Sequence, residues 1–209
     1  GRPKTAYHAL KPACRPVHVA ITAEGLNGLG VHAVNETSTA RDLRLVMASY
    51  GDGPNPLAKA DATVTLAPRS AHSWSSFALL GHFFDAAHAY RFGPLAHEAT
   101  LVRLLDAETG NLVAEAAHVL PGRACTPRDI GLAVSVMHLD GGPALVLSTA
   151  RLARFVTIDD AGFRASDEGF CLAPGETRVV PLVRRRGTDL PRGTVSALNS
   201  NPVPYEAAA

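Results

Sequence analysis

Apolar residues that alternate with polar ones most constrain the fold of this chain. The alternation begins after Arg15 in residues 17–22 and recurs in residues 43–48 and 100–106. Successive side chains of a strand point to opposite faces, so this period of two predicts strands that are buried on one face. No stretch has the pattern of a strand, a long helix and a second strand, which excludes doubly wound and βα-barrel domains. We therefore predict an all-β fold of antiparallel strands.

The predicted strands fall into two groups, separated by a proline- and glycine-rich segment at residues 121–127. Turn signals between the strands are spaced as in immunoglobulin-like sandwiches. We predict a first sandwich at residues 15–122 and a second, smaller one at residues 123–209, with a frayed tail after its last strand. Residues 1–14 precede both groups and predict a short helix ended by Pro12.

Charge and cysteine content limit the partners and the compartment. The net charge is +1, which gives no electrostatic basis for binding nucleic acid or an anionic membrane. No apolar run approaches the roughly 20 residues that cross a bilayer. Cys14, Cys125 and Cys171 are odd in number, far apart and without C-x-x-C spacing. This pattern favours a reducing compartment, and we expect a cytoplasmic location.

Two further patterns are considered as a phosphate-binding loop and as a metal site. The glycines of residues 25–30 precede an alternating strand, whereas a phosphate-binding loop must open a helix, so a hairpin turn is favoured. His82, His88 and His97 have neither helical nor zinc-site spacing. We expect no cofactor and no metal site.

Candidate catalytic groups are also sparse. Acidic pairs occur at residues 159–160 and 167–168, but neighbouring residues on a strand face opposite ways, which favours solvated turns. There is no Gly-x-Ser-x-Gly elbow, and no cysteine has a context that would activate it. The chain therefore predicts no catalytic residue.

Aromatic residues suggest one core and one binding surface. Residues 83–94 contain three of the seven phenylalanines and end in a Gly-Pro turn, so we assign Phe84, Tyr90 and Phe92 to the structural core. The single tryptophan, Trp74, lies among serines and has two interpretations. It is either a sandwich-core tryptophan, which we favour, or an exposed platform for a carbohydrate.

Several segments resemble a known family in their order along the chain. They are Ala-Tyr-Arg-Phe-Gly-Pro at residues 89–94 followed by His97, together with residues 25–35, 172–176 and 193–199. This combination resembles the C-terminal accessory β-sandwich region behind the barrel of β-mannosidase-like family-2 glycoside hydrolases. Departures such as His88, where the family often has an aromatic residue, loosen the assignment to mannosides.

The resemblance implies the organisation and the function that we expect. Residues 1–14 would be the tail of the preceding catalytic barrel, whose glutamates have no counterpart in this chain. The chain would be a non-catalytic accessory region of a glycoside hydrolase. The catalytic barrel of that parent enzyme would carry out O-glycosyl hydrolysis within carbohydrate metabolism. It would brace its own barrel domain or an oligomer contact. The alternatives are a carbohydrate-binding module with a site near Trp74 and an immunoglobulin-like adhesion module, for which fold alone is no evidence.

Overall fold

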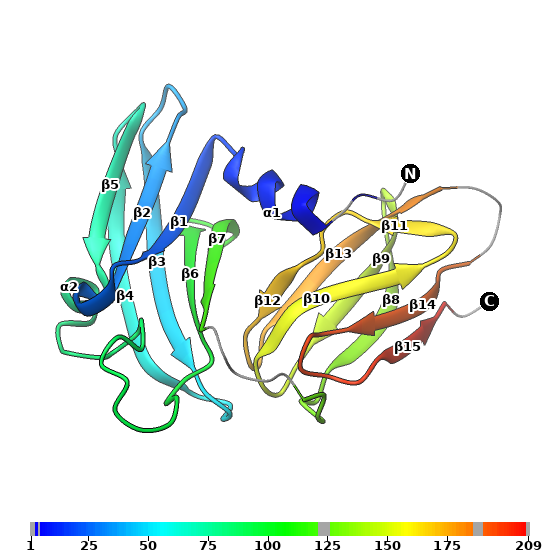
Figure 1. Ribbon diagram of the computed structural model, residues 1–209. Coiled ribbons are helices and arrows are strands. Elements are labelled where there is room, and N and C mark those ends of the chain that lie inside the picture. The colour runs from blue at the N-terminus through cyan, green and yellow to red at the C-terminus, as the bar shows by residue number, and fades with distance from the viewer. Residues whose placement is uncertain (1–2, 4, 121–125, 186–189, 208–209) are drawn as a thin grey trace. The chain divides into compact units, whose positions relative to one another are not determined.

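The computed structural model describes residue 3 and residues 5–120, 126–185 and 190–207 of the chain (Figure 1). It divides into two compact units. One comprises residues 9–123 and the other residues 124–209 with residues 1–8. The predicted boundary between residues 122 and 123 lies outside the described residues. The helix α1 (Thr5–Ala13) continues through Pro12, which was predicted to end it.

The first sandwich pairs a three-stranded sheet with a four-stranded one. Its strands are β1 (Val17–Ala23), β2 (Leu29–Asn35), β3 (Arg41–Tyr50), β4 (Pro56–Leu66), β5 (Ser70–Ser75), β6 (Ala99–Asp106) and β7 (Leu112–Val119). The sheet orders are β1-β2-β5 and β4-β3-β6-β7, with antiparallel pairing throughout. Inward-facing residues of both sheets, such as Val31 and Leu45, form one core. Alternation along these strands produces that core, as predicted.

The glycine-rich segment after β1 differs in detail from a simple hairpin turn. It forms a 3₁₀ turn, η1 (Gly25–Asn27), followed by Gly28 at φ +80°. A Cβ at Gly28 would lie 2.6 Å from Oγ of Ser76, so only glycine fits there. The strand β5 ends at Ser75, which caps a short helix, α2 (Ser76–Leu80), by accepting a hydrogen bond from the Ala78 amide.

One buried amide fixes the end of β2. Asn35 is completely buried, and its Nδ2 donates to the carbonyl oxygens of Thr39, Leu66 and Ala67 at 2.9, 3.2 and 3.0 Å. Its Oδ1 accepts a hydrogen bond from the Thr37 amide. Buried polar groups are costly unless they are paired, and this side chain is paired on both sides. Asn35 therefore ties the turn after β2 to the end of β4.

The second sandwich pairs two four-stranded sheets. Its strands are β8 (Ala133–Leu139), β9 (Gly142–Ser148), β10 (Ala153–Asp160), β11 (Phe163–Ala165), β12 (Phe170–Leu172), β13 (Thr177–Arg184), β14 (Arg192–Ser196) and β15 (Val203–Glu206). The sheet orders are β12-β10-β14-β15 and β11-β13-β9-β8. The core between them contains Phe163, Phe170 and Tyr205. The prediction of an all-β chain with antiparallel immunoglobulin-like sandwiches is confirmed.

The C-terminal tail contains a strand that was not predicted. Residues 203–206 form β15, which pairs antiparallel with β14. Tyr205 anchors this strand, because its hydroxyl donates a 2.9 Å hydrogen bond to Oδ2 of Asp160. Asp160 also accepts hydrogen bonds from the amides of Gly162, Phe163 and Arg192. The predicted solvated acidic turn is therefore wrong for Asp160, which is buried as the centre of this network.

Within the described part of the chain, no helix combines the length and apolarity needed to span a bilayer.

Candidate functional site

A long irregular connection in the first sandwich forms the candidate site. Residues 81–98, between α2 and β6, contain neither helix nor strand and are called the aromatic loop below. Connections longer than about 12 to 15 residues are uncommon in compact domains and are usually functional or disordered. The hydrogen bonds of this loop show an ordered backbone, which favours a functional segment.

Asp85 holds the tip of the aromatic loop. Its Oδ1 accepts a hydrogen bond from the Ala89 amide at 2.9 Å, and its Oδ2 accepts one from the Tyr90 amide at 3.0 Å. His88, just before these two residues, and Arg91, just after them, have φ values of +49° and +51°. Left-handed backbone is strained for residues other than glycine and persists only where the surroundings enforce it. The loop therefore holds one specific conformation.

His97 anchors the base of the aromatic loop. It is buried, and its Nε2 donates to the Ala86 carbonyl oxygen at 3.1 Å, because a carbonyl can only accept. Burial lowers the pKa of His97 below its ordinary value. The Phe84 ring covers this imidazole, with ring centroids 5.1 Å apart. The buried end of the loop thus depends on a neutral histidine.

The other rings of the loop face outward, and the core assignment of Tyr90 and Phe92 is wrong. Phe92 is 88% exposed, Phe83 61% and Tyr90 38%. Phe84 is only half-buried and does not belong to the sandwich core either. The physical reason is that the backbone after Ala86 is irregular and partly left-handed. It therefore lacks the strand alternation that would direct these rings inward. They contact one another instead, with centroids 5.2 Å apart for Phe83 and Tyr90 and 6.5 Å apart for Tyr90 and Phe92.

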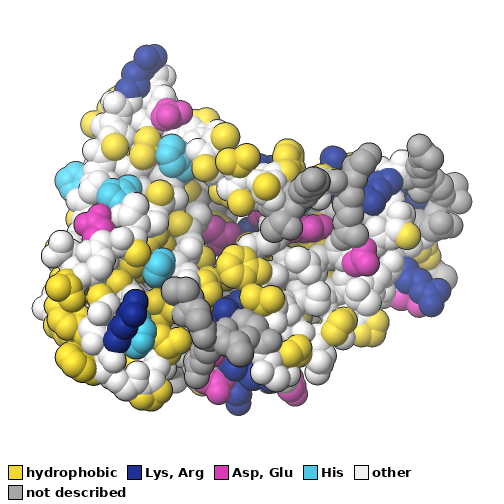
Figure 2. Space-filling model, viewed as in Figure 1, with side chains coloured by type: hydrophobic (Ala, Val, Ile, Leu, Met, Phe, Trp, Pro, Cys, Tyr) yellow, Lys and Arg dark blue, Asp and Glu magenta, His cyan; other side chains and the backbone are white. Residues whose placement is uncertain are grey.

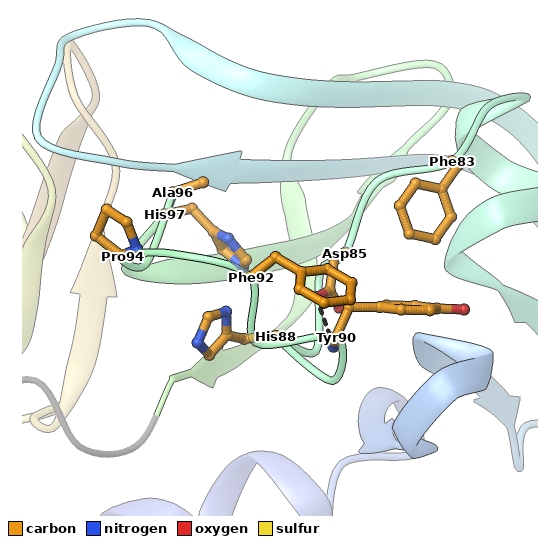
Figure 3. Close-up of a pocket in the computed structure, with 8 residues that line it drawn as sticks. All are labelled: Phe83, Asp85, His88, Tyr90, Phe92, Pro94, Ala96 and His97. Atoms are coloured by element: carbon orange, nitrogen blue, oxygen red, sulfur yellow. Dashed lines mark hydrogen bonds between the residues drawn. The ribbon is translucent and has the colours of Figure 1, made fainter.

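The outward rings border a hollow of about 450 Å³ (Figure 3). The residues that line it all come from the aromatic loop: Phe83, Asp85, His88, Tyr90, Phe92, Pro94, Ala96 and His97. Figure 2 shows hydrophobic side chains gathered with histidine and a basic side chain where this loop lies in Figure 1. The volume is in the range of small-ligand pockets, about 300 to 1,000 Å³. The hollow combines apolar ring faces with a carboxylate and two imidazoles.

Trp74 does not take part in this hollow. It lies on β5 opposite Val31, which is fully buried, so its side chain is directed to the inner face of the sheet. There it is half-buried against the core and contacts His72, with ring centroids 4.4 Å apart. This placement agrees with the sandwich-core interpretation. A carbohydrate role for Trp74 stays a prediction without further support.

The remaining polar clusters do not form a catalytic arrangement in the described residues. His32 lies between Oγ of Ser73 and Oγ1 of Thr22, both 2.8 Å from its ring, on an exposed sheet face. Glu24 contacts Thr22 and not the imidazole, so no acid orients the ring as a nucleophile–base pair requires. Asp167 is paired with Arg178 at 2.6 Å. Among the described residues, no three potential ligands gather into a metal site.

This segment was recognisable in the sequence, but the arrangement of its side chains was not. His88 and His97 were expected to form no metal site, and Tyr90 and Phe92 were assigned to the core, whereas all four line one hollow. Asp85 and Phe83 were not considered as site residues. The available signal was the lack of any period across 18 residues, counted from 81 to 98, which predicts a loop more strongly than aromatic content predicts burial.

Comparison with known proteins shows which folds the chain is similar to. Residues 128–197 match Ig_mannosidase, an Ig-fold domain family. An exo-chitosanase from Amycolatopsis orientalis superposes with a TM-score of 0.65 at 16% identity, over 97% of this chain and 28% of the enzyme. A β-D-mannosidase from Dictyoglomus thermophilum gives 0.67 at 18% identity, over 88% and 21%. No curated protein matches the chain.

The chain thus spans between a fifth and a third of the length of these two enzymes, and at such identities the likeness concerns the fold. The family match covers most of the second sandwich. Residues 128–197 therefore match an Ig-fold domain family, and the fold of the chain is similar to part of these two glycosidases. Both findings are consistent with the resemblance to the C-terminal accessory β-sandwich region of family-2 glycoside hydrolases.

Proposed function

We propose that the chain is a non-catalytic accessory region that braces the catalytic domain of a glycoside hydrolase. The parent reaction in this proposal is hydrolysis of a β-linked hexopyranoside, with a β-mannoside as the first choice. Support comes from the Ig_mannosidase match and from neighbours named as a β-D-mannosidase and an exo-chitosanase. Both neighbours are several times longer than this chain, which leaves room in such a protein for a separate catalytic domain.

The observation that carries the bracing role is the apolar face of α1. Tyr7 and Leu10 lie three residues apart and therefore on one face of the helix, yet they are 54% and 64% exposed. A helix of nine residues gains little stability from its backbone and depends on packing of its apolar face. We infer that the catalytic domain covers Tyr7 and Leu10 in the longer protein.

The test compares the double variant Tyr7→Ser/Leu10→Ser in two contexts. In the full-length enzyme we expect a lower Tm and lower specific activity, because an apolar contact with the catalytic domain is lost. In the 209-residue chain alone the free energy of unfolding should change by no more than about 0.5 kcal/mol, as for most exposed positions. The matched control is Leu57→Ser, since Leu57 is a comparably exposed (54%) apolar residue on β4.

Equal effects of the double variant in both contexts would refute the bracing contact, as would no effect in either. The substrate class is tested separately on the full-length enzyme, by comparing hydrolysis of p-nitrophenyl β-D-mannoside with that of the β-D-glucosaminide. Preference for the glucosaminide would replace the mannoside assignment and leave the bracing role intact.

A further inference from the structure

The outward rings of the aromatic loop form an unpartnered apolar surface on the first sandwich. Phe92, at 88% exposure, is the most exposed large apolar side chain in the described part of the chain. Phe83 and Tyr90 lie beside it, and Phe77 stacks on Phe83 with ring centroids 5.4 Å apart. Burying such a side chain is favourable because its apolar surface is removed from water. A contiguous exposed group of this kind marks an interaction site.

The polar groups of the hollow narrow the kind of ligand. His88 lines the same hollow, on the side of Phe92 away from the Tyr90 ring (Figure 3), and its imidazole can donate and accept hydrogen bonds. The Asp85 oxygens each accept one backbone hydrogen bond and keep further lone pairs for a second donor. A ligand suited to this hollow needs an apolar face for the rings and an edge with both donors and acceptors.

The rings are also held in place before any ligand arrives. Asp85 fixes the amide of Tyr90, the left-handed residues His88 and Arg91 set the path of the loop, and the Tyr90 hydroxyl reaches the Leu26 carbonyl at 3.5 Å. The cost of ordering the loop backbone is therefore met on folding and does not weaken binding. Strained backbone of this kind is concentrated at functional sites.

We propose that this hollow binds carbohydrate, accommodating one or two pyranose rings of an oligosaccharide. The C–H face of a sugar would lie on Phe92 and Tyr90, whose planes differ by 32°, because the negative face of an aromatic ring attracts weakly positive C–H groups. The hydroxyl groups on the sugar edge would reach His88 and Asp85. This site is separate from the apolar face of α1 and does not depend on the bracing role.

The test is a titration of the 209-residue chain with β-1,4-linked mannotetraose and, in parallel, with the glucosamine tetramer. Binding is followed by saturation-transfer NMR and by shifts of the phenylalanine and tyrosine ring signals. We expect saturable binding of at least one oligosaccharide with a Kd of about 1 mM or lower. Mannitol, an acyclic polyol without a ring face, should not bind.

Two variants locate the site. Phe92→Ser should weaken binding about tenfold or more and preserve the fold, because the ring is almost fully exposed. His88→Gly should also weaken binding, and glycine tolerates the positive φ of this position. The matched control is Tyr7→Ser, which removes a 54% exposed ring elsewhere and should leave Kd unchanged.

Three results would overturn the proposal. They are no saturable binding of either oligosaccharide at about 20 mM, equal affinity of Phe92→Ser and the unaltered chain, and binding of mannitol as strong as that of the sugars. Absence of sugar binding together with a lower Tm of the full-length enzyme carrying Phe92→Ser would assign this surface to a protein contact instead.

Discussion

The two sandwiches differ in where most of their aromatic side chains lie. In the second, Phe163, Phe170 and Tyr205 are each less than a tenth exposed and form part of the core between the sheets. In the first, the core cluster is aliphatic apart from Met47, with Trp74 half-buried against it and Tyr50 buried on β3, whereas the outward rings of the aromatic loop are displayed on the surface. Aromatic rings thus stabilise the core of the second sandwich, and those of the aromatic loop are available on the first for contact with another molecule.

The backbone explains this difference. The buried rings of the second sandwich lie on the strands β11, β12 and β15, which pair with β13, β10 and β14 and are thereby held in the two sheets that enclose the core. The outward rings of the first belong to an irregular loop shaped by left-handed residues and by the carboxylate of Asp85. Aromatic content alone does not determine burial, because the local backbone decides where the rings point.

The largest expected effect is a contrast between Phe163→Ala and Tyr90→Ala. Phe163 is 2% exposed, so its truncation should cost about 3 to 5 kcal/mol of the second sandwich's unfolding free energy. Tyr90→Ala should cost about 1 kcal/mol or less. The two sandwiches need not unfold together, so each needs its own probe. Fluorescence of Trp74, the single tryptophan, follows unfolding of the first sandwich, and methyl NMR signals follow unfolding of the second. Equal costs would break the comparison.

An intermediate effect is expected for Tyr205→Phe, which tests whether β15 is held by its hydroxyl group. The variant removes the hydrogen bond to buried Asp160 and should destabilise the second sandwich by about 1 to 3 kcal/mol. Burial raises the pKa of Tyr205, so the hydroxyl stays protonated and donates at neutral pH. Amide hydrogen exchange in residues 203–206 is the measurement, and Tyr7→Phe, at an exposed tyrosine, is the control. An unchanged exchange rate would contradict this role.

The smallest expected effect is a pH dependence confined to the first sandwich. Burial lowers the pKa values of His97 and His118 below the ordinary 6.5, so the unfolded chain binds protons more readily. The contribution of these two groups to the unfolding free energy is complete above pH 6.5 and is lost as the pH falls through their lowered pKa values. The single histidine of residues 126–209, His138, is exposed.

Denaturant unfolding at about pH 7.5 and about pH 5.5, followed through Trp74, measures this effect. His97→Gln keeps a side-chain donor but does not titrate in this range, so it should reduce the loss of stability on acidification. If the second sandwich lost as much stability as the first between these conditions, the assignment to His97 and His118 would be wrong.

Much of the fold was predictable from the period of two, whereas its exceptions follow from weak local signals. The long strands β3 and β6 were predicted from the alternation of residues 43–48 and 100–106, although their burial in the structure is more continuous than a period of two. The three-residue strands β11 and β12 are too short to show a period, and β15 lies in a proline-containing tail whose burial depends on Asp160. These elements are fixed by tertiary contacts.

The candidate site was less predictable than the fold. Residues 83–94 were recognised as distinctive, but the outward direction of Phe92 depends on a loop path set by hydrogen bonds to Asp85. His97 illustrates the same limit, since its sequence position gives no sign that its Nε2 donates a hydrogen bond to the Ala86 carbonyl oxygen. Long-range and loop geometry of this kind leaves no periodic trace in the sequence.

The buried amide of Asn35 has a consequence for covalent modification. Asn35-Glu36-Thr37 has the form of an N-glycosylation sequon, yet the nitrogen that would carry the glycan donates to three carbonyl groups inside the first sandwich. Folding and glycosylation at this asparagine therefore exclude each other. In a compartment that contains oligosaccharyltransferase, a chain modified before β2 and β4 came together would lose the amide's hydrogen bonds and leave a bulky sugar at the end of β2, whereas a folded chain would be protected.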